Sequence, residues 1–272
     1  MELGLEGRAG IVTGASRGIG LATARALAGE GARVLLCGRD ADALSKATRV
    51  CAEEAARHGR DPEGAASLAL DVTDADAGER LVEACHDRFG SLDLLVNNAG
   101  TMRRRPLEEL TDAEWQEQWE LHVMASMRLM RAAAPVMAER GWGRIVNVSS
   151  SSGKRPSPSN AAYSVSKAAQ LSLSRVFADE YAAQGVLVNA VAPGVVNTGL
   201  WLDAGGLADQ SAEAAGTTRE EALAAAAAKV PLGRFGTEEE IAAAIVFLCS
   251  ERASNVAGAA WSVDGGSVPV IL

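Results

Sequence analysis

The chain has 272 residues, 48% of them hydrophobic, and its 26 basic and 35 acidic side chains give a formal net charge of −9. This acidic balance argues against general binding to nucleic acids or anionic membranes, because both require a basic surface. No apolar run is long enough for a membrane span, no signal peptide is visible, and the cysteines are widely spread without a CxxC pair, so we expect a cytoplasmic protein without a metal site.

Short apolar runs typical of strands alternate along the chain with longer segments whose apolar residues have helical spacing. This repeated order favours parallel strands with helices on both faces of one sheet, the α/β class. No linker rich in proline, serine or charge divides the chain, so we expect one domain over residues 1–272. The predicted strands are Ala9–Val12, Arg33–Cys37, Ser67–Leu70, Leu92–Val96, Arg144–Val148, Val186–Val191 and Trp261–Val263.

Two stretches interrupt this rhythm. Ser149–Asn160 is rich in serine and proline, which predicts a loop between a strand and a helix. Gly199–Lys229 is a long insertion that ends in an alanine-rich helix, Arg219–Lys229, and a connection of this length is typical of a lid or binding loop. A plain surface helix is the alternative for the alanine-rich half. The apolar residues predicted to cover a pocket are Leu200, Trp201 and Leu207.

The first predicted strand runs directly into Thr13–Gly20, which has G-x-x-x-G-x-G spacing and opens the first predicted helix. Glycine permits a tight turn, and a helix N-terminus presents free N–H groups to a pyrophosphate. Such a turn alone is weak evidence, but its place between the first strand and first helix favours dinucleotide binding. The candidate contacts are Gly14, Ser16, Arg17, Gly18, Ile19 and Gly20.

The end of the second predicted strand bears on the choice of nicotinamide cofactor. An acidic residue there would bind the adenosine ribose and repel a 2′-phosphate. In this chain that position holds Gly38, and Arg39 follows it. Arg17 can converge on the same place, and two guanidiniums suit a phosphate. We therefore predict NADP(H); the alternative is that both arginines are ordinary solvated side chains.

Tyr163 and Lys167 are four residues apart at the start of a predicted helix, on one helical face. The pKa of a free tyrosine is near 10, and a neighbouring ammonium and a positive nicotinamide ring would each lower it. Ser150, just beyond the strand Arg144–Val148, could hydrogen-bond a substrate oxygen on which charge develops. The Tyr-x-x-x-Lys pair is unspecific alone and gains weight beside the glycine loop and the serine.

In this combination and order, the motifs resemble those of the short-chain dehydrogenase/reductases, in their compact single-domain branch. The matching residues cover almost the whole chain: Thr13–Gly20, Asp71-Val72, Asn97–Gly100, Ser150, Tyr163 with Lys167, Pro193-Gly194 with Thr198, and Val263–Gly266.

The resemblance implies a Rossmann-type, doubly wound sheet of seven parallel strands and hydride transfer between a nicotinamide and a ketone or secondary alcohol. It implies that Tyr163 is the general acid/base, that Lys167 contacts the nicotinamide ribose and that Ser150 polarises the substrate oxygen. Reduction of a 3-oxoacyl substrate is the default prediction. The further cofactor contacts it implies, with Tyr163 and Lys167, are Asp71, Val72, Asn97, Ala99, Gly100, Pro193, Gly194, Val196 and Thr198.

One position departs from the family pattern. The family's catalytic asparagine, counted back from Pro135, falls on His122. In the family this asparagine holds a water that links the lysine to solvent. Imidazole can donate and accept protons, so His122 could act as a relay; a satisfied core histidine without catalytic part is the alternative. A catalytically eroded NADP(H)-binding sensor or scaffold is the alternative function, against which the intact Ser150, Tyr163 and Lys167 weigh.

Basic residues follow two of the motifs: Arg103–Arg105 come after Gly100, and Lys154 and Arg155 come after Ser150. In the family both stretches border the substrate mouth, so this rim could attract a carboxylate or a CoA or carrier-protein thioester. A solvated charge run is the alternative. The resemblance also implies a homo-oligomer, a tetramer or a dimer, in which Trp119 lies on an interface helix; from the sequence, Trp115 and Trp119 are core or interface aromatics.

Overall fold

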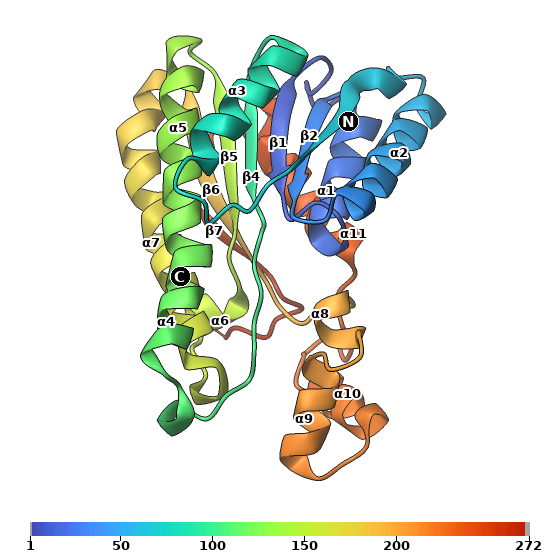
Figure 1. Ribbon diagram of the computed structural model, residues 1–272, viewed down its shortest axis with the longest axis vertical. Coiled ribbons are helices and arrows are strands. Elements are labelled where there is room, and N and C mark those ends of the chain that lie inside the picture. The colour runs from blue at the N-terminus through green and yellow to red at the C-terminus, as the bar shows by residue number, and fades with distance from the viewer. Residues whose placement is uncertain (1, 270–272) are drawn as a thin grey trace.

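In the computed structural model, which describes residues 2–269, seven parallel strands form one sheet in the order β3-β2-β1-β4-β5-β6-β7. The order runs outward from β1 in one direction and from β4 in the other, so the predicted doubly wound Rossmann architecture is confirmed (Figure 1). The strands are β1 (Ala9–Thr13), β2 (Arg33–Gly38), β3 (Ala65–Ala69), β4 (Leu94–Asn97), β5 (Gly143–Val148), β6 (Val186–Pro193) and β7 (Ala260–Val263).

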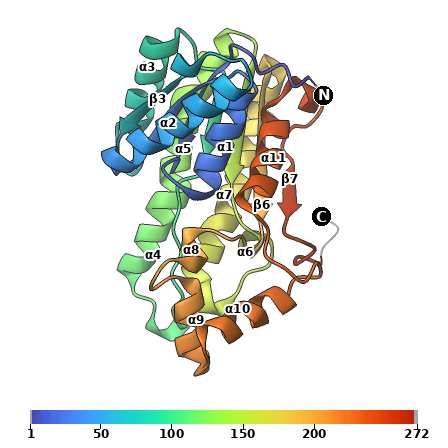
Figure 2. The ribbon, with the colours of Figure 1, turned by 90° about the vertical axis from the view of Figure 1, so that its right-hand side faces the viewer.

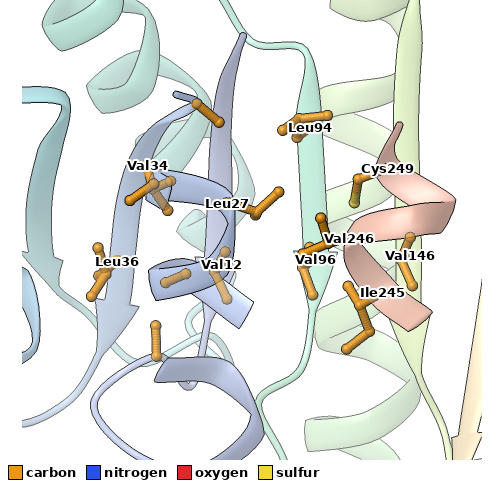
Figure 3. Close-up of a cluster of buried hydrophobic side chains, with 14 of the residues drawn as sticks. Val12, Leu27, Val34, Leu36, Leu94, Val96, Val146, Ile245, Val246 and Cys249 are labelled. Atoms are coloured by element: carbon orange, nitrogen blue, oxygen red, sulfur yellow. The ribbon is translucent and has the colours of Figure 1, made fainter. Parts of the chain in front are cut away.

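Helices cover both faces of the sheet, because neighbouring side chains of a strand point to opposite faces and both sets are apolar. Val12 of β1 belongs to the core under α1 (Gly18–Gly29), α2 (Ala41–Arg57) and α11 (Glu238–Cys249). Figure 3 shows this core, with Leu27 of α1 and Ile245 of α11 over the strands. Ile11 belongs to the opposite core, under α3 (Ala77–Phe89), α5 (Ala125–Glu139) and α7 (Ala161–Tyr181).

The strand boundaries differ from the prediction by up to two residues. The predicted strand Leu92–Val96 begins only at Leu94, where pairing with Gly10 starts. Before it, the Asp93 carboxylate accepts a hydrogen bond from the Ala9 N–H over 2.9 Å. At this point a side-chain carboxylate, and not a backbone carbonyl of the neighbouring strand, accepts the hydrogen bond of the Ala9 N–H. The spacing of apolar residues gives no information about such a bond, so it could not predict this strand boundary.

The loops after β1 and β4 meet at the carboxyl edge of the sheet. The two strands are neighbours, with Val12 opposite Val96, although the strands that follow them lie in opposite directions. In open α/β sheets, ligands bind in the crevice at this reversal. The fold therefore brings the glycine loop beside the turn Asn97–Gly100.

The prediction of an uninterrupted loop over Ser149–Asn160 is wrong. The segment contains the short helix α6 (Ser151–Lys154) and a 3-10 turn at Pro158–Asn160. Ser150 Oγ accepts the N–H of Ser152 over 3.1 Å at the start of α6. Serine and proline favour the first turn of a helix as well as loops, so composition did not separate the two.

The insertion between β6 and α11 forms α8 (Gly199–Leu202), α9 (Leu207–Ala215) and α10 (Arg219–Ala228). These helices lie beyond one end of the sheet, apart from the helices that cover its faces (Figures 1 and 2). The alanine-rich helix is present as predicted, and a capping box of Thr218 and Glu221 starts it.

The chain reaches α5 through α4 (Asp112–Trp119) and a π-helical turn, Glu120–Met124. Trp119, at the end of α4, is 39% exposed, so this side chain is not part of the core. Between residues 2 and 269, no helix has the length and hydrophobicity needed to cross a bilayer.

Candidate active site

The glycine loop forms a cradle that only glycine can line. Gly14 and Gly18 have φ values of +61° and +63°, which L side chains rarely adopt. A Cβ on Gly20 would lie 2.3 Å from the Gly14 carbonyl oxygen, and one on Gly14 would lie 2.9 Å from Ala99 Cα. The loop therefore packs backbone against backbone, while a Cβ on Gly18 would meet nothing closer than 3.7 Å.

Helix α1 begins at this cradle, and no side chain in the described part of the chain caps it. Uncapped N–H groups and the positive end of the helix dipole favour an anion. The residues present thus fit the pyrophosphate of a dinucleotide. Ser16, Arg17 and Ile19 belong to the same turn, as predicted from the sequence.

Thr13 and Asn98 hold the glycine loop against the loop after β4. Thr13 Oγ1 accepts the N–H groups of Asn98 and Ala99, each over 3.0 Å. Asn98 Nδ2 donates to the carbonyl oxygens of Thr13, over 2.9 Å, and Gly14. Sequence reasoning placed Asn98 in a family motif without a role. Its neighbour Asn97, a candidate cofactor contact, instead donates from Nδ2 to Asn147 Oδ1 inside the sheet, over 2.8 Å.

The glycine loop that carries Arg17 lies beside the end of β2, which Arg39 follows, because the Ala15 N–H donates to the Cys37 carbonyl oxygen over 3.0 Å. Each guanidinium has a carboxylate neighbour. Arg17 Nη1 is 2.5 Å from Asp203 Oδ2, and Arg39 Nη1 is 3.9 Å from Asp71 Oδ2. Both side chains are exposed, so a phosphate arriving from solvent can reach them.

The remaining cofactor candidates also lie on loops after strand ends. Asp71 and Val72 follow β3; burial raises the pKa of Asp71, but hydrogen bonds from Thr73 outweigh it and leave that pKa lowered. Pro193 ends β6, and Val196 and Thr198 lead into α8. A Cβ on Gly194 would lie 2.8 Å from Asp264 Cα, so glycine is required for this close approach.

Ser150, Tyr163 and Lys167 come together as predicted, where β5 ends and α7 begins. Ser150 is buried and Tyr163 half-buried, and both line one cleft with a volume of about 1370 Å³. Lys167 Nζ is 5.9 Å from the centroid of the Tyr163 ring. Nζ donates hydrogen bonds to the Val148 carbonyl oxygen over 2.8 Å and to Gln170 Oε1 over 3.1 Å.

Burial dominates the titration of this pair. It raises the pKa of Tyr163, and the Ser150 hydroxyl offsets this only in part. Burial also lowers the pKa of Lys167 to about 7. The expected lowering of the tyrosine pKa by the lysine is absent, because a lysine with this pKa has already lost its proton in the pH range where a tyrosine titrates.

His122 is fully buried in the π-helical turn, and both of its ring nitrogens have partners. Ser166 Oγ donates to the Tyr163 carbonyl oxygen, so it accepts from His122 Nδ1, 2.9 Å away. His122 Nε2 accepts the N–H of Thr101 over 3.4 Å. Burial and then the charge of Lys167 hold the pKa of His122 well below its usual value. The imidazole is therefore neutral and connects the loop after β4 with α7.

The cleft has two kinds of wall. Polar residues from α6 and the turn before α7 line the side near Tyr163, and the other wall, from α8–α10, mixes apolar residues with the polar side chains of Gln210, Ser211, Glu213 and Glu221. The apolar cover predicted from the insertion is present, since Leu200, Trp201 and Leu207 all line the cleft. Trp201 packs edge-on against Phe235, with ring centroids 5.1 Å apart. Residues 2–269 hold no group of His, Cys, Asp and Glu side chains suited to a metal ion.

Comparison with known proteins agrees with this geometry. Residues 14–267 match the family described as enoyl-(acyl carrier protein) reductase. The chain is 40% identical over 266 residues to cis-4-hydroxycyclohexanecarboxylate dehydrogenase from Sinomonas cyclohexanicum, with 97% of each chain covered. It is 35% identical over 266 residues to 3-oxoacyl-[acyl-carrier-protein] reductase from Vibrio cholerae, which covers 97% of this chain and 98% of the relative.

The structure of L-sorbose reductase from Gluconobacter frateurii, complexed with NADPH and L-sorbose, superimposes with a TM-score of 0.90 at 36% identity and covers both chains fully. Family match, relatives and fold agree over nearly the whole length. The chain therefore belongs to the short-chain dehydrogenase/reductases and is an oxidoreductase that uses a nicotinamide cofactor.

Proposed function

We propose that the protein reduces a ketone to a secondary alcohol, or catalyses the reverse reaction, with NADP(H) and with Tyr163 as the general acid/base. The observation that carries the proposal is the placement of Ser150 and Tyr163 in one cleft, with Lys167 buried beside Tyr163. A protein released from catalysis has no physical need for a buried lysine without a carboxylate partner.

When held at the glycine loop and the N-terminus of α1, the cofactor would supply the hydride that the carbonyl carbon receives. Tyr163 gives its phenolic proton to the carbonyl oxygen, so a C–H and an O–H bond form as the C=O π bond breaks. Ser150 donates a hydrogen bond to the same oxygen as negative charge develops on it. Lys167 in its charged form favours the phenolate that remains on Tyr163, and protons from solvent restore the tyrosine.

NADP(H) is favoured over NAD(H) by Arg39 at the end of β2, where Gly38 stands in place of an acid, and by Arg17 in the neighbouring glycine loop. Structures of relatives with NADPH, such as that of L-sorbose reductase, support the same choice. Arg39→Ala should weaken NADPH binding and leave NADH binding nearly unchanged. Equal affinities of the unaltered protein for the two cofactors would contradict the preference.

The substrate class is a ketone with an anionic group, and Arg104 is a rim residue placed to bind that group. Arg155 also lines the cleft, and its guanidinium donates to the neutral Ser267 carbonyl oxygen over 3.4 Å. Arg105 is neutralised by Glu114, 2.9 Å away. Arg104 also lines the cleft, but its guanidinium donates to neutral oxygens, Ser211 Oγ at 2.5 Å and Ser159 Oγ at 3.2 Å. A guanidinium held by neutral groups keeps its charge available for an anion.

Within this class the default stays a 3-oxoacyl substrate, which the name of the Vibrio cholerae relative supports; the Sinomonas relative's name points to a free hydroxy acid. Arg104→Gln should lower kcat/KM for anionic ketones about tenfold or more and spare neutral ketones. Arg105→Gln is the matched control. An equal loss on neutral ketones would mean that Arg104 only joins α9 to the turn before α7.

The test of the reaction is NADPH consumption across neutral ketones, diketones, oxo acids and 3-oxoacyl thioesters, with Tyr163→Phe as the control. Turnover that is lost in Tyr163→Phe supports the proposal. Tight NADPH binding with no turnover on any compound would favour the sensor or scaffold instead.

A further inference from the structure

Lys167 is a buried cation whose surroundings offer no carboxylate. Its side chain is 3% exposed, and in the described structure none of the ion pairs includes it. The titratable groups that face it are His122, which is neutral and has the lowered pKa given above, and Tyr163. Burial of an ammonium without a counter-ion is costly, so hydrogen-bond acceptors are needed to stabilise it in addition to the Tyr163 ring, whose centroid lies 5.9 Å from Nζ.

Two such acceptors are present. The Val148 carbonyl oxygen, at 2.8 Å, belongs to the backbone of β5 and is fixed by the sheet. The second acceptor, Gln170 Oε1 at 3.1 Å, belongs to a side chain one turn further along α7. Gln170 is therefore the one acceptor of Lys167 in residues 2–269 that a substitution can remove.

The amide of Gln170 is held in the orientation that this contact requires. Gln170 is 1% exposed, and its Nε2 donates to Ser126 Oγ on α5 over 2.9 Å. Because Nε2 faces Ser126, the carbonyl oxygen Oε1 faces Lys167. The reverse orientation would bring the amide NH2 group against the donors of Lys167 and leave buried groups unsatisfied.

We propose that Gln170 is a positioning residue of the active site, whose Oε1 holds Lys167 Nζ beside Tyr163 and favours the charged form of the lysine. Ser126 fixes the amide and so acts through Gln170. The inference rests on the proposed role of Lys167, but it concerns the ionisation of that lysine, which can be measured without turnover.

The test compares Gln170→Leu with Gln170→Glu. Leucine removes the acceptor and should lower the lysine pKa, whereas glutamate adds a negative charge and should raise it. NADPH affinity is measured from about pH 6 to about pH 9 in a Tyr163→Phe background, where tyrosine no longer titrates in the site. The midpoint at which affinity falls as the lysine loses its proton should move to lower pH by about one unit in Gln170→Leu, a tenfold change in the ionisation constant, and to higher pH in Gln170→Glu.

The downward shift in Gln170→Leu decides the proposal, since replacing a residue that only fills space would leave the midpoint unchanged, whereas the upward shift in Gln170→Glu shows that a charge at this position reaches the lysine. Ser126→Ala should give a smaller shift with the sign of Gln170→Leu. Ser174→Ala is the matched control, because it removes a hydrogen bond to the Gln170 backbone carbonyl and leaves the contact with Lys167 in place. Thermal unfolding of each variant checks that it folds.

Unchanged midpoints, or shifts of the same sign in both Gln170 variants, would overturn the inference. A protein that shows the opposite shifts but turns over no carbonyl compound would refute the proposed function and leave the inference standing. The two failures are thereby distinguishable.

Discussion

His122 Nδ1 donates a hydrogen bond to Ser166 Oγ over 2.9 Å and so joins the π-helical turn before α5 to helix α7. Ser166 passes this connection to the backbone of Tyr163, and Nε2 receives the N–H of Thr101. With both nitrogens engaged and the ring neutral, we expect His122 to support the position of Tyr163 as a satisfied core histidine, which is one of the two hypotheses from the sequence; the proton relay is the other.

His122→Ala should lower the free energy of unfolding by about 2–4 kcal/mol, because it leaves a cavity and removes the hydrogen bonds to Ser166 Oγ and the Thr101 N–H. His122→Asn should recover part of this loss. The pH profile of the remaining activity should keep its shape in both variants, measured as kcat/KM over the stable pH range. A titration that disappears with the histidine would restore the relay hypothesis.

The buried Lys167 makes stability depend on pH. Its pKa is about 7 in the folded protein against an ordinary 10.5, so between these values the unfolded chain binds more protons. The free energy of unfolding should therefore rise with pH across this window; below it the cost of burying the charged lysine is fully present and no longer varies with pH. Lys167→Met should remove that slope in urea unfolding at several pH values, while a slope equal to that of the unaltered protein would contradict the assignment.

Gly20→Ala should abolish NADPH binding and destabilise the fold, because its Cβ would lie 2.3 Å from the Gly14 carbonyl oxygen. Gly59→Ala is the control for backbone strain alone: Gly59 has φ +67°, and a Cβ added there would meet no atom within 4 Å. The control should lose about 1–2 kcal/mol of stability and keep its cofactor affinity. Calorimetric titration with NADPH separates the two outcomes.

Asp203 pairs with Arg17, one of the two arginines proposed to bind the 2′-phosphate. An exposed pair of this kind contributes about 0.2–1 kcal/mol. Asp203→Asn should therefore tighten NADPH binding by up to about fivefold at low salt and leave NADH binding unchanged. Equal effects on both cofactors would place the phosphate away from Arg17.

Exposed apolar side chains gather on α4 and α7, where Trp119 is 39%, Val165 45% and Val176 61% exposed. We expect these helices to form the interface of a homo-oligomer, because apolar groups on two adjoining helices gain from mutual burial. Light scattering should give a dimer or tetramer, and Trp119→Glu should shift it towards smaller species. A monomer at micromolar concentration would refute the expectation.

The amino-acid sequence determined the fold class and the chemistry of the site. The alternation of apolar runs specified a parallel sheet, because both faces of such a sheet must be apolar. The glycine loop requires glycines at fixed spacing, and the proposed site requires a tyrosine and a lysine one helical turn apart. Both requirements concern residues that are close in the chain, so the sequence alone can show them.

Tertiary structure decided what depends on segments far apart in the chain. The partners of His122 come from two other segments of the chain. The proposed role of Gln170 became apparent only in the folded structure, where α5 places Ser126 against the Gln170 amide. The sequence pattern treated the arginines of the rim alike, and only folding paired Arg105 with Glu114 and Arg104 with neutral serines. Burial, which sets the ionisation of Tyr163 and Lys167, is a property of the packed chain, and no spacing of residues encodes it.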